Sequence, residues 1–550
     1  MEPSRAAKHR PYTLLALSGF ALVVFSFGLG RLALVGPDEP RYAEVAREMF
    51  ATGDWVSPRL CGCLWFEKPA LLYWMSAASY HLFGVNEFAA RLPSVAGAMV
   101  MMLFLYHVLS RAVTERFALT ASLALVTGGL VIAYARVATP DMPLAAALTI
   151  TLLSGYQAAR SAGRARLGYW ALSFAALGLA MLAKGLAGVA LAVGIFAIYF
   201  MLMKQPSFIR WREALMGTAI FLVVAGTWYA PVTIKHGWPF IEEFFIQHHF
   251  RRYTSNTFGH PQPFYFFFEI LLAGTVPWTF FLAPAAARLR SIKPHATARD
   301  SLLAFAWVWV AVPLLFFSFS ESKLPGYILP IFPALAIIIG AEIERFADGE
   351  RGRLLSAAAW MTALLFAIIA AGFAVYLLRE QVNLSAWRRV LFGLPLAIAA
   401  LSIAALAVKK RQAFVIGAAA VVLSVIIGAA VLLLPKLSEK LTLKSLSLEA
   451  AAALKPGERI TFFIKKEFAP VFYAEGRVVC GFGDNDVLNA LSEDVIANAL
   501  ENESSLIVIT TSNWRKGIEN DERFATELIA TQGESLAIRV GLKRKTASAE

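Results

Sequence analysis

Charged residues are scarce in this sequence, since only 16% of its 550 residues are Asp, Glu, Lys or Arg. An average soluble protein has about 25%. Hydrophobic residues make up 58% of the chain, and the mean hydropathy is +0.60. This balance excludes an ordinary soluble protein and predicts a polytopic α-helical membrane protein.

Cysteine is also scarce, and its three copies are Cys61, Cys63 and Cys480. Three cysteines are too few for a disulfide framework, and Cys61-Gly62-Cys63 is not a CxxC pair. The motif is therefore either a free or loosely bridged loop pair or, less favoured, part of a metal site.

Thirteen apolar segments approach the length of about 20 residues that a membrane helix requires. The fifth and sixth are short and are separated only by Lys184-Gly185, so the count depends on them. The predicted spans lie near 12–34, 91–110, 117–136, 140–159, 168–183, 186–203, 213–231, 265–287, 301–320, 325–343, 354–378, 387–408 and 412–434.

Basic residues predict the orientation of these spans. Alternate connections carry clusters such as Arg160, Arg164 and Arg166, and the pattern continues on both sides of the doubtful fifth and sixth segments. The positive-inside rule then places the N-terminus in the cytoplasm and the C-terminus outside. Because the net charge of +13 is dispersed in these short clusters, no nucleic acid partner is expected.

In this orientation, nearly all unusual polar residues lie on the outer side of the membrane. A transporter would more often carry ionisable residues at mid-depth within broken spans, so the pattern favours chemistry at one membrane surface. We expect a membrane domain over 1–436, whose external loops 35–90 and 232–264 carry the site, and a separate domain over 437–550.

The tail, over 437–550, changes character. The stretches "ERITFFI" and "SLIVITT" predict short buried strands, and "DNDVLNALSEDVIANALEN" has helical periodicity. We expect a small soluble α/β domain with an accessory role. Neither GxGxxG nor GxxxxGK[ST] occurs in it, so no nucleotide site is predicted.

The first outer loop begins with an acidic pair, Asp38 and Glu39, followed by Pro40. Proline in a first turn, and the apolar spacing in "RYAEVAREMF", predict an amphipathic helix at the membrane surface. The two carboxylates either cap this helix and complement its dipole or serve chemistry, and the sequence leaves both options open.

Glu67-Lys68-Pro69 is predicted to open a second apolar helix in "EKPALLYWMSAASYHLFG". Glu67 suits a helix N-terminus, whereas a cation is disfavoured there. Lys68 therefore either binds an anion such as a lipid phosphate or extends toward the headgroups.

The second outer loop contains His248, His249 and Arg251. The two histidines would provide ligands for a divalent metal such as zinc if Glu67 came close, although their spacing matches no recognised metal motif. Arg251 suits a phosphate, because a guanidinium binds phosphate oxygens in a bidentate manner.

Single polar residues at the outer ends of other spans complete the candidates. Asp141 would by default cap a helix, and Lys184 stands between two spans. Lys323 and Tyr327 are explained equally well as anchors at the membrane interface.

Together these residues resemble the C-type integral-membrane glycosyltransferases, and most closely the bacterial aminoarabinose transferases that modify lipid A. The resemblance covers the whole membrane portion, is most specific in the first loop and is weak in the tail. The segments that carry it are Gly36 to Tyr42, Trp65 to Pro69, Arg91 to Ser94, Pro140-Asp141, Lys184-Gly185 and His248 to Tyr253.

The resemblance implies inverting transfer of 4-amino-4-deoxy-L-arabinose from undecaprenyl phosphate to a lipid A phosphate. The reaction would occur at the periplasmic face of the bacterial inner membrane and give resistance to polymyxin and other cationic peptides. Donor lipid, lipid A and membrane lipids are the expected partners. The expected catalytic residues are Asp38, Asp141 and Glu67, and those expected to bind the lipid phosphate are Lys68, Arg41, Tyr42, Lys184, Arg251 and Tyr327.

Other functions remain open at this point. Another polyprenyl-phosphate-sugar-dependent transferase, such as a protein O-mannosyltransferase, would share these features, and the residues cannot choose the sugar. A lipid flippase would be expected to show an inverted repeat and charges at mid-depth. A scaffold without activity would leave the gathering of ionisable residues on one face unexplained.

Overall fold

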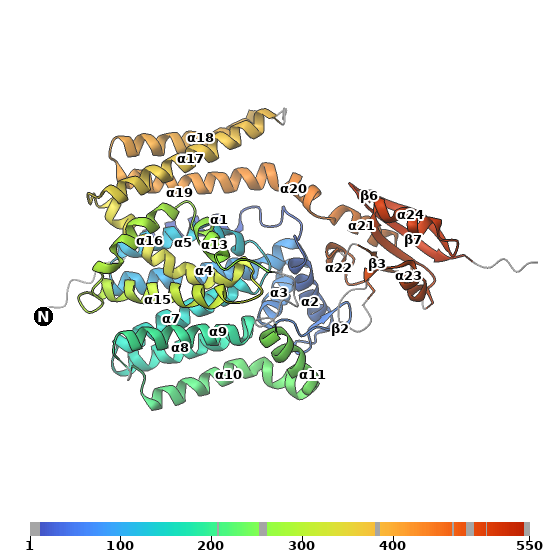
Figure 1. Cartoon of the computed structure of the whole chain (residues 1–550), viewed down its shortest axis with the longest axis horizontal. Coiled ribbons are helices and arrows are strands. Elements are labelled where there is room, and N and C mark those ends of the chain that lie inside the picture. The colour runs from blue at the N-terminus through green and yellow to red at the C-terminus, as the bar shows by residue number, and fades with distance from the viewer. Residues whose placement is uncertain are drawn as a thin grey trace, which may run out of the picture. The chain divides into compact units, whose positions relative to one another are not determined.

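The computed structural model describes residues 11–205, 208–251, 261–379, 386–464, 467–479, 489–501 and 503–543 (Figure 1). The chain divides into two compact units. The first, which we call the helical unit, combines Met1–Gly28 with Leu92–Leu432. The second, which we call the mixed unit, combines Leu29–Arg91 with Leu433–Glu550. The first predicted outer loop therefore shares a unit with the tail.

The helical unit is built from helices and their connections over the part of the chain described. One of them, α4, starts within the mixed unit and continues into the helical unit. The helices are α1 (Pro11–Ser26), α4 (Glu87–Ala112), α5 (Glu115–Val126), α6 (Gly129–Ala135), α7 (Asp141–Arg160), α8 (Gly163–Lys184), α9 (Leu186–Leu202), α10 (Trp211–His236), α11 (Trp238–Ile241), η1 (Glu242–Arg251), α13 (Phe266–Gly274), η2 (Thr279–Phe281), α14 (Leu282–Arg288), η3 (Leu289–Ser291), α15 (Ala298–Ser318), η4 (Pro325–Ile331), α16 (Phe332–Ala347), α17 (Arg353–Arg379), α18 (Ala386–Ala407), α19 (Arg411–Gly428) and η5 (Ala429–Leu433).

Each of the thirteen predicted segments coincides with one of these apolar helices or with a consecutive group of them. Within the described ranges, seven are long and apolar enough to cross a membrane by length and composition. Two more segments are bent pairs, α5 with α6 at 64° and α13 with Thr279–Ser291 at 112°. The remaining segments are shorter apolar helices, Tyr12–Ser26, Leu186–Leu202, Arg353–Ile369 and Gly393–Ala407.

The junction between the fifth and sixth segments is a glycine turn. Gly185 adopts φ 72°, and its N–H donates to the carbonyl of Met181. Because this backbone conformation favours glycine, α8 ends there and α9 begins at Leu186. The two short segments are therefore separate helices, as predicted.

Small residues allow close helix packing in this unit. A Cβ added to Gly340 on α16 would lie 2.4 Å from the Cα of Ala121 on α5. Thr120 Oγ1 of α5 also donates to the carbonyl of Gly340 at 2.9 Å. Close backbone approach through small residues and a polar contact across helices are typical of membrane helix packing.

The mixed unit begins with the amphipathic helix expected after the acidic pair. This helix, α2 (Asp38–Thr52), buries the predicted stripe of Tyr42, Val45, Ala46 and Met49. The prediction from 3.6-residue periodicity is therefore confirmed. The other elements of the first loop are β1 (Arg59–Leu60), β2 (Cys63–Leu64) and α3 (Leu71–Phe83).

The start of the second loop helix was predicted wrongly. It begins at Leu71 with Ala70 as its N-cap residue and has no side-chain cap. Glu67 and Lys68 therefore precede the helix, and Glu67 does not cap it.

A tight hairpin holds the two cysteines of the first loop. Leu60 pairs with Cys63, and the turn residues Cys61 and Gly62 have φ 55° and 82°. Positive φ at both positions is the geometry of a two-residue hairpin turn. Cys61 and Cys63 are partly exposed, whereas Cys480 lies outside the described residues.

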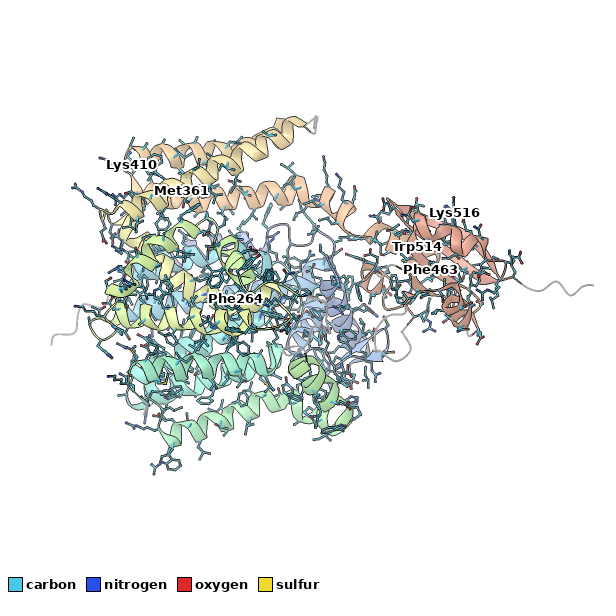
Figure 2. The ribbon with its side chains drawn as sticks, viewed as in Figure 1. Phe264, Met361, Lys410, Phe463, Trp514 and Lys516 are labelled. Atoms are coloured by element: carbon cyan, nitrogen blue, oxygen red, sulfur yellow. The ribbon has the colours of Figure 1, made fainter. Side chains whose placement is uncertain are left out.

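The tail folds as an α/β domain around a five-stranded sheet of order β4-β3-β5-β7-β6 (Figure 1). Strands β4, β3 and β5 are parallel, and β7 runs antiparallel to β5 and β6. Phe463, at the end of β3, belongs to the core of this domain (Figure 2). The elements are α20 (Leu434–Leu441), α21 (Lys444–Ala453), β3 (Arg459–Phe463), α22 (Ala469–Tyr473), β4 (Asn489–Ala490), α23 (Glu493–Leu500), β5 (Leu506–Thr511), α24 (Ser512–Asn520), β6 (Phe524–Gln532) and β7 (Ser535–Leu542).

Both predicted strands of the tail are confirmed as β3 and β5, but the helix predicted from "DNDVLNALSEDVIANALEN" is only partly right. Its second half forms α23. Asn489–Ala490 instead forms β4, because it pairs in parallel with the end of β3. Residues 484–488 and 502 lie outside the described residues.

A buried ion pair joins α4 to α2 within the mixed unit. Arg91 and Glu39 are exposed to 2% and 1%, and two nitrogen–oxygen contacts of 2.9 and 2.8 Å make the pair bidentate. Arg91 also donates to the carbonyls of Leu29, Leu32 and Ala33 at 2.6 to 2.9 Å. One side chain therefore anchors the segment that leads into α2.

Arg91→Met should destabilise the mixed unit by about 3–5 kcal/mol, because it leaves Glu39 as an uncompensated buried charge. Unfolding of the full chain in detergent micelles measures the change, with exposed Arg351→Met as the control. The double variant Glu39→Leu/Arg91→Met should be less destabilised than Arg91→Met alone. An equal or larger loss in the double variant would contradict the ion-pair explanation.

A second buried carboxyl on α2 carries a shifted pKa. Glu44 is fully buried, and its oxygens accept both Nε and Nη2 of Arg47 at 2.8 Å. Burial raises the pKa of Glu44 to about 8, although the hydrogen bonds from Arg47 act in the opposite direction. The folded state thus holds this proton more tightly than the unfolded chain. The resulting stability is complete below the ordinary pKa of 4.5 and is lost as the pH rises through 8.

We therefore expect the free energy of unfolding of the mixed unit to fall between about pH 5 and pH 8, by at most about 1.4 kcal/mol per pH unit. Glu44→Gln should flatten this dependence, because the amide does not titrate. Protease resistance of the tail in the full-length protein, followed across this range, provides the measurement. Exposed Glu534→Gln is the matched control and should keep the wild-type slope.

Candidate active site

Four charged side chains of the first loop meet in the mixed unit, and we call Asp38, Arg41, Glu67 and Lys68 the loop cluster. Arg41 Nη2 donates to Asp38 Oδ1 at 2.6 Å, and Arg41 Nη1 lies 3.7 Å from Glu67 Oε2. Lys68 Nζ donates to Glu67 Oε1 at 2.6 Å. The fold thus joins the first turn of α2 to the segment that precedes α3.

The two carboxylates at the start of α2 lie in different environments. The Asp38 side chain is 43% exposed and pairs with Arg41, whereas Glu39 is buried against Arg91. The N-cap residue is Pro37, which receives no side-chain cap. Asp38 is therefore not the N-cap residue, but both carboxylates lie in the first turn of α2, where negative charge complements the helix dipole. Glu39 also accepts the N–H of Val35 at 2.9 Å.

Aromatic rings flank the guanidinium of the loop cluster. The Cζ of Arg41 lies 5.6 Å from the centroid of the Trp65 ring and 4.8 Å from that of Phe468. Trp65 belongs to the motif that carries the resemblance, but Phe468 comes from the tail. No feature of the local sequence around Phe468 indicates this contact.

Two tyrosines lie behind the cluster. The rings of Tyr42 on α2 and Tyr73 on α3 are 6.3 Å apart, and both residues are buried. Burial, followed by the negative charge of Glu67, raises the pKa of both phenols well above 10. Both therefore keep their protons at neutral pH. Tyr73 was missed from the sequence, where it looks like one more apolar position of α3.

A second group of candidate residues lies in the helical unit, and we call Asp141, Lys184 and Tyr327 the helix-end cluster. Lys184 Nζ, at the end of α8, donates to Asp141 Oδ1 at 2.5 Å. The same Nζ lies 4.8 Å from the centroid of the Tyr327 ring on η4. Asp141 is not the N-cap residue of α7, since Pro140 holds that position, and it lies in the first turn of the helix.

The backbone of η4 approaches this cluster closely. A Cβ added to Gly326 would lie 2.8 Å from Asp141 Oδ1 and 2.7 Å from the Oη of Tyr134. Only glycine fits there without displacement of these groups, and neither Gly326 nor Tyr134 was a predicted site residue. Lys323, expected as an interface anchor, is instead buried and donates to the carbonyls of Ser320 and Gln262.

The remaining predicted residues are His248, His249 and Arg251. Their backbone belongs to η1, but their side chains lie outside the described part of the structure. Among the described side chains, no group of three or more His, Cys, Asp or Glu is arranged to hold a metal ion. The predicted metal set of Glu67, His248 and His249 is therefore not tested.

Comparison with known proteins identifies the class of fold. Residues 67–230, which include Glu67, Lys68, Asp141 and Lys184, match the family model described as dolichyl-phosphate-mannose-protein mannosyltransferase. The crystal structure of ArnT from Cupriavidus metallidurans bound to undecaprenyl phosphate superposes with a TM-score of 0.80. That comparison covers 96% of this chain and 98% of the other, at 24% sequence identity. The chain has the fold of the C-type integral-membrane glycosyltransferases, and the predicted fold class is confirmed.

Curated relatives make the resemblance more specific. The undecaprenyl phosphate-alpha-4-amino-4-deoxy-L-arabinose arabinosyl transferase of Erwinia tasmaniensis is 34% identical over 369 residues. Transferase 2 of the same description from Pseudomonas fluorescens is 32% identical over 355 residues. These matches cover 66% and 62% of this chain, and 65% and 62% of the relatives' own length. The resemblance inferred from the sequence motifs is therefore confirmed.

Proposed function

We propose that this protein transfers 4-amino-4-deoxy-L-arabinose from undecaprenyl phosphate to phosphate groups of lipid A. The relatives named for that donor and sugar support the proposal. The observation that carries it is the loop cluster, where two cations, Arg41 and Lys68, are held by two carboxylates at a half-exposed helix start.

The leaving group of this reaction is a lipid phosphate, whose departure needs positive charge more than a strong acid. Arg41 and Lys68 provide that charge in the loop cluster. Each is already paired with a carboxylate of Asp38 or Glu67. An arriving phosphate would therefore join these pairs as a further partner of the cations.

The acceptor is itself a phosphate and is largely ionised at neutral pH, so the reaction requires no strong general base. Asp38, the most exposed carboxylate of the loop cluster, would orient the acceptor or pair with the ammonium of the sugar. Asp141 would share this task. A single displacement with inversion then needs no covalent sugar intermediate.

The other predicted residues would act on the donor phosphate. Lys184, oriented by Asp141 and by the ring of Tyr327, carries the charge of the helix-end cluster. The protonated phenol of Tyr42 would donate a hydrogen bond to a phosphate oxygen. Arg251 would add a bidentate contact. A metal at Glu67, His248 and His249 is not needed for any of these steps.

The location follows from the topology prediction. Both clusters belong to segments that the positive-inside rule places on the outer side of the membrane. In a Gram-negative bacterium this is the periplasmic face of the inner membrane. Aminoarabinose on lipid A would reduce the negative charge of the outer membrane and hence the binding of polymyxin.

A protein O-mannosyltransferase-like reaction is the second candidate, and the description of the matching family model favours it. Its acceptor is a hydroxyl, so Asp38 would have to accept a proton. The two functions are therefore distinguished by whether a phosphate or a hydroxyl receives the sugar.

Expression in a polymyxin-sensitive Gram-negative host that lacks its own transferase tests the function. Mass spectrometry of lipid A should then show added aminoarabinose, and polymyxin resistance should rise. Unmodified lipid A, despite good membrane expression and a supplied donor, would exclude the aminoarabinose assignment. Mannosylated protein in the same cells would favour the second candidate.

Asp38→Asn and Lys68→Ala should each reduce transfer by about 100-fold or more, because each removes a charge aimed at the reacting groups. Purified variants assayed with donor lipid and lipid A provide the measurement. Exposed-charge variants of the tail, Glu534→Gln and Lys455→Ala, are the matched controls and should retain full activity. Near-normal transfer by Asp38→Asn would contradict its catalytic role.

A further inference from the structure

We propose that Phe468, a residue of the tail, is a positioning residue of the loop cluster that holds Arg41 for binding of the donor phosphate. The inference rests on the proposed function, because it concerns the same cluster. It assigns to the tail a direct part in the site, in place of the accessory role expected from its sequence.

Aromatic rings and polar groups both contact the guanidinium of Arg41. Trp65 and Phe468 lie within 5.6 and 4.8 Å of the guanidinium carbon, where a cation interacts favourably with an aromatic ring. Polar groups contact its edges, since Nε donates to the carbonyl of Pro37 at 3.0 Å and Nη2 donates to Asp38.

This arrangement leaves donor capacity for an anion. A guanidinium carries five N–H groups in one plane, and the bonds to Pro37 and Asp38 engage Nε and Nη2. Nη1 lies 3.7 Å from Glu67, which is longer than a hydrogen bond. The ring of Phe468 offers no polar atom that would compete with a phosphate. Phe468 therefore contacts the guanidinium of Arg41 without occupying its donors.

Phe468 itself is held in place by the helix that follows it. Tyr473, at the end of α22, accepts the N–H of Leu34 and donates to Glu87 Oε1, both at 3.0 Å. Lys444 Nζ donates to the same Glu87 oxygen at 2.5 Å. These bonds tie α22 to the segment that enters α2, all within the mixed unit.

A second connection lies directly after α22. Arg47 Nη2, on α2, donates to the carbonyl of Glu475 at 2.9 Å. A Cβ added to Gly476 would lie 2.5 Å from Glu44 Oε1, so the backbone of the tail packs against α2 here. The contact between Phe468 and Arg41 is therefore part of a continuous interface between α2 and α22.

Two substitutions distinguish the cation–π contact of the Phe468 ring from simple apolar packing of its side chain. Phe468→Leu keeps an apolar side chain but removes the aromatic face, whereas Phe468→Tyr keeps that face. Trp514→Ala is the control, because Trp514 is an aromatic residue of the tail that lies at its surface on α24 (Figure 2). Each variant is compared with the full-length wild type in detergent micelles.

The readouts are the affinity for undecaprenyl phosphate alone, KM and kcat for the donor lipid, and the thermal unfolding midpoint. Phe468→Leu should weaken the affinity and raise KM by about 5- to 30-fold, the range expected for loss of a partly desolvated cation–π contact. Its kcat should change less than about twofold, and its thermal midpoint should stay near that of the wild type. Phe468→Tyr and Trp514→Ala should both behave as wild type.

Wild-type affinity and KM in Phe468→Leu would overturn the inference. A joint fall of kcat and thermal midpoint, with the affinity for undecaprenyl phosphate unchanged, would also overturn it by showing a purely structural role. Failure of the proposed function gives a different result, because lipid A would then stay unmodified by the wild type. In that case, loss of undecaprenyl phosphate affinity in Phe468→Leu would still support the positioning role.

Discussion

The buried ion pair between Arg91 and Glu39 is the contact on which the candidate site depends. A guanidinium inside a protein is tolerated only when its N–H groups find partners. Arg91 makes five hydrogen bonds, to Glu39 and to the carbonyls of the segment that leads into α2. Asp38 and Arg41 occupy the same first turns of α2 as Glu39. By fixing Glu39, the ion pair therefore also fixes the positions of the Asp38 and Arg41 side chains at the start of α2.

The loop cluster has an even balance of charge, with two carboxylates and two cations in an alternating chain. This pairing keeps half-buried cations in defined positions before any ligand arrives. Each cation therefore has its charge compensated within the folded chain. The helix-end cluster repeats the principle, with Lys184 held between a carboxylate and an aromatic ring.

The tail has an ordinary α/β sequence, yet it contacts the first loop directly. Its sheet has a core of its own. Its short helix α22 packs on α2, however, and brings Phe468 to Arg41 and Tyr473 to Leu34. Contacts place the first loop in one unit with the tail, whereas the sequence assigns that loop to the membrane domain.

The sequence by itself determined the thirteen apolar segments, the buried face of α2 and two strands of the tail. Each depends on a local rule of length or periodicity that reads directly from neighbouring residues. Only the tertiary structure decided that Glu39 pairs with Arg91, and that Glu67 precedes α3. It also showed that Tyr73, Gly326 and Phe468 lie beside the candidate site residues. Asn489–Ala490, which was predicted as helix, is a strand. The contacts of Glu39, Gly326 and Phe468 and the pairing of Asn489–Ala490 depend on partners far away in the chain, so no local pattern specifies them.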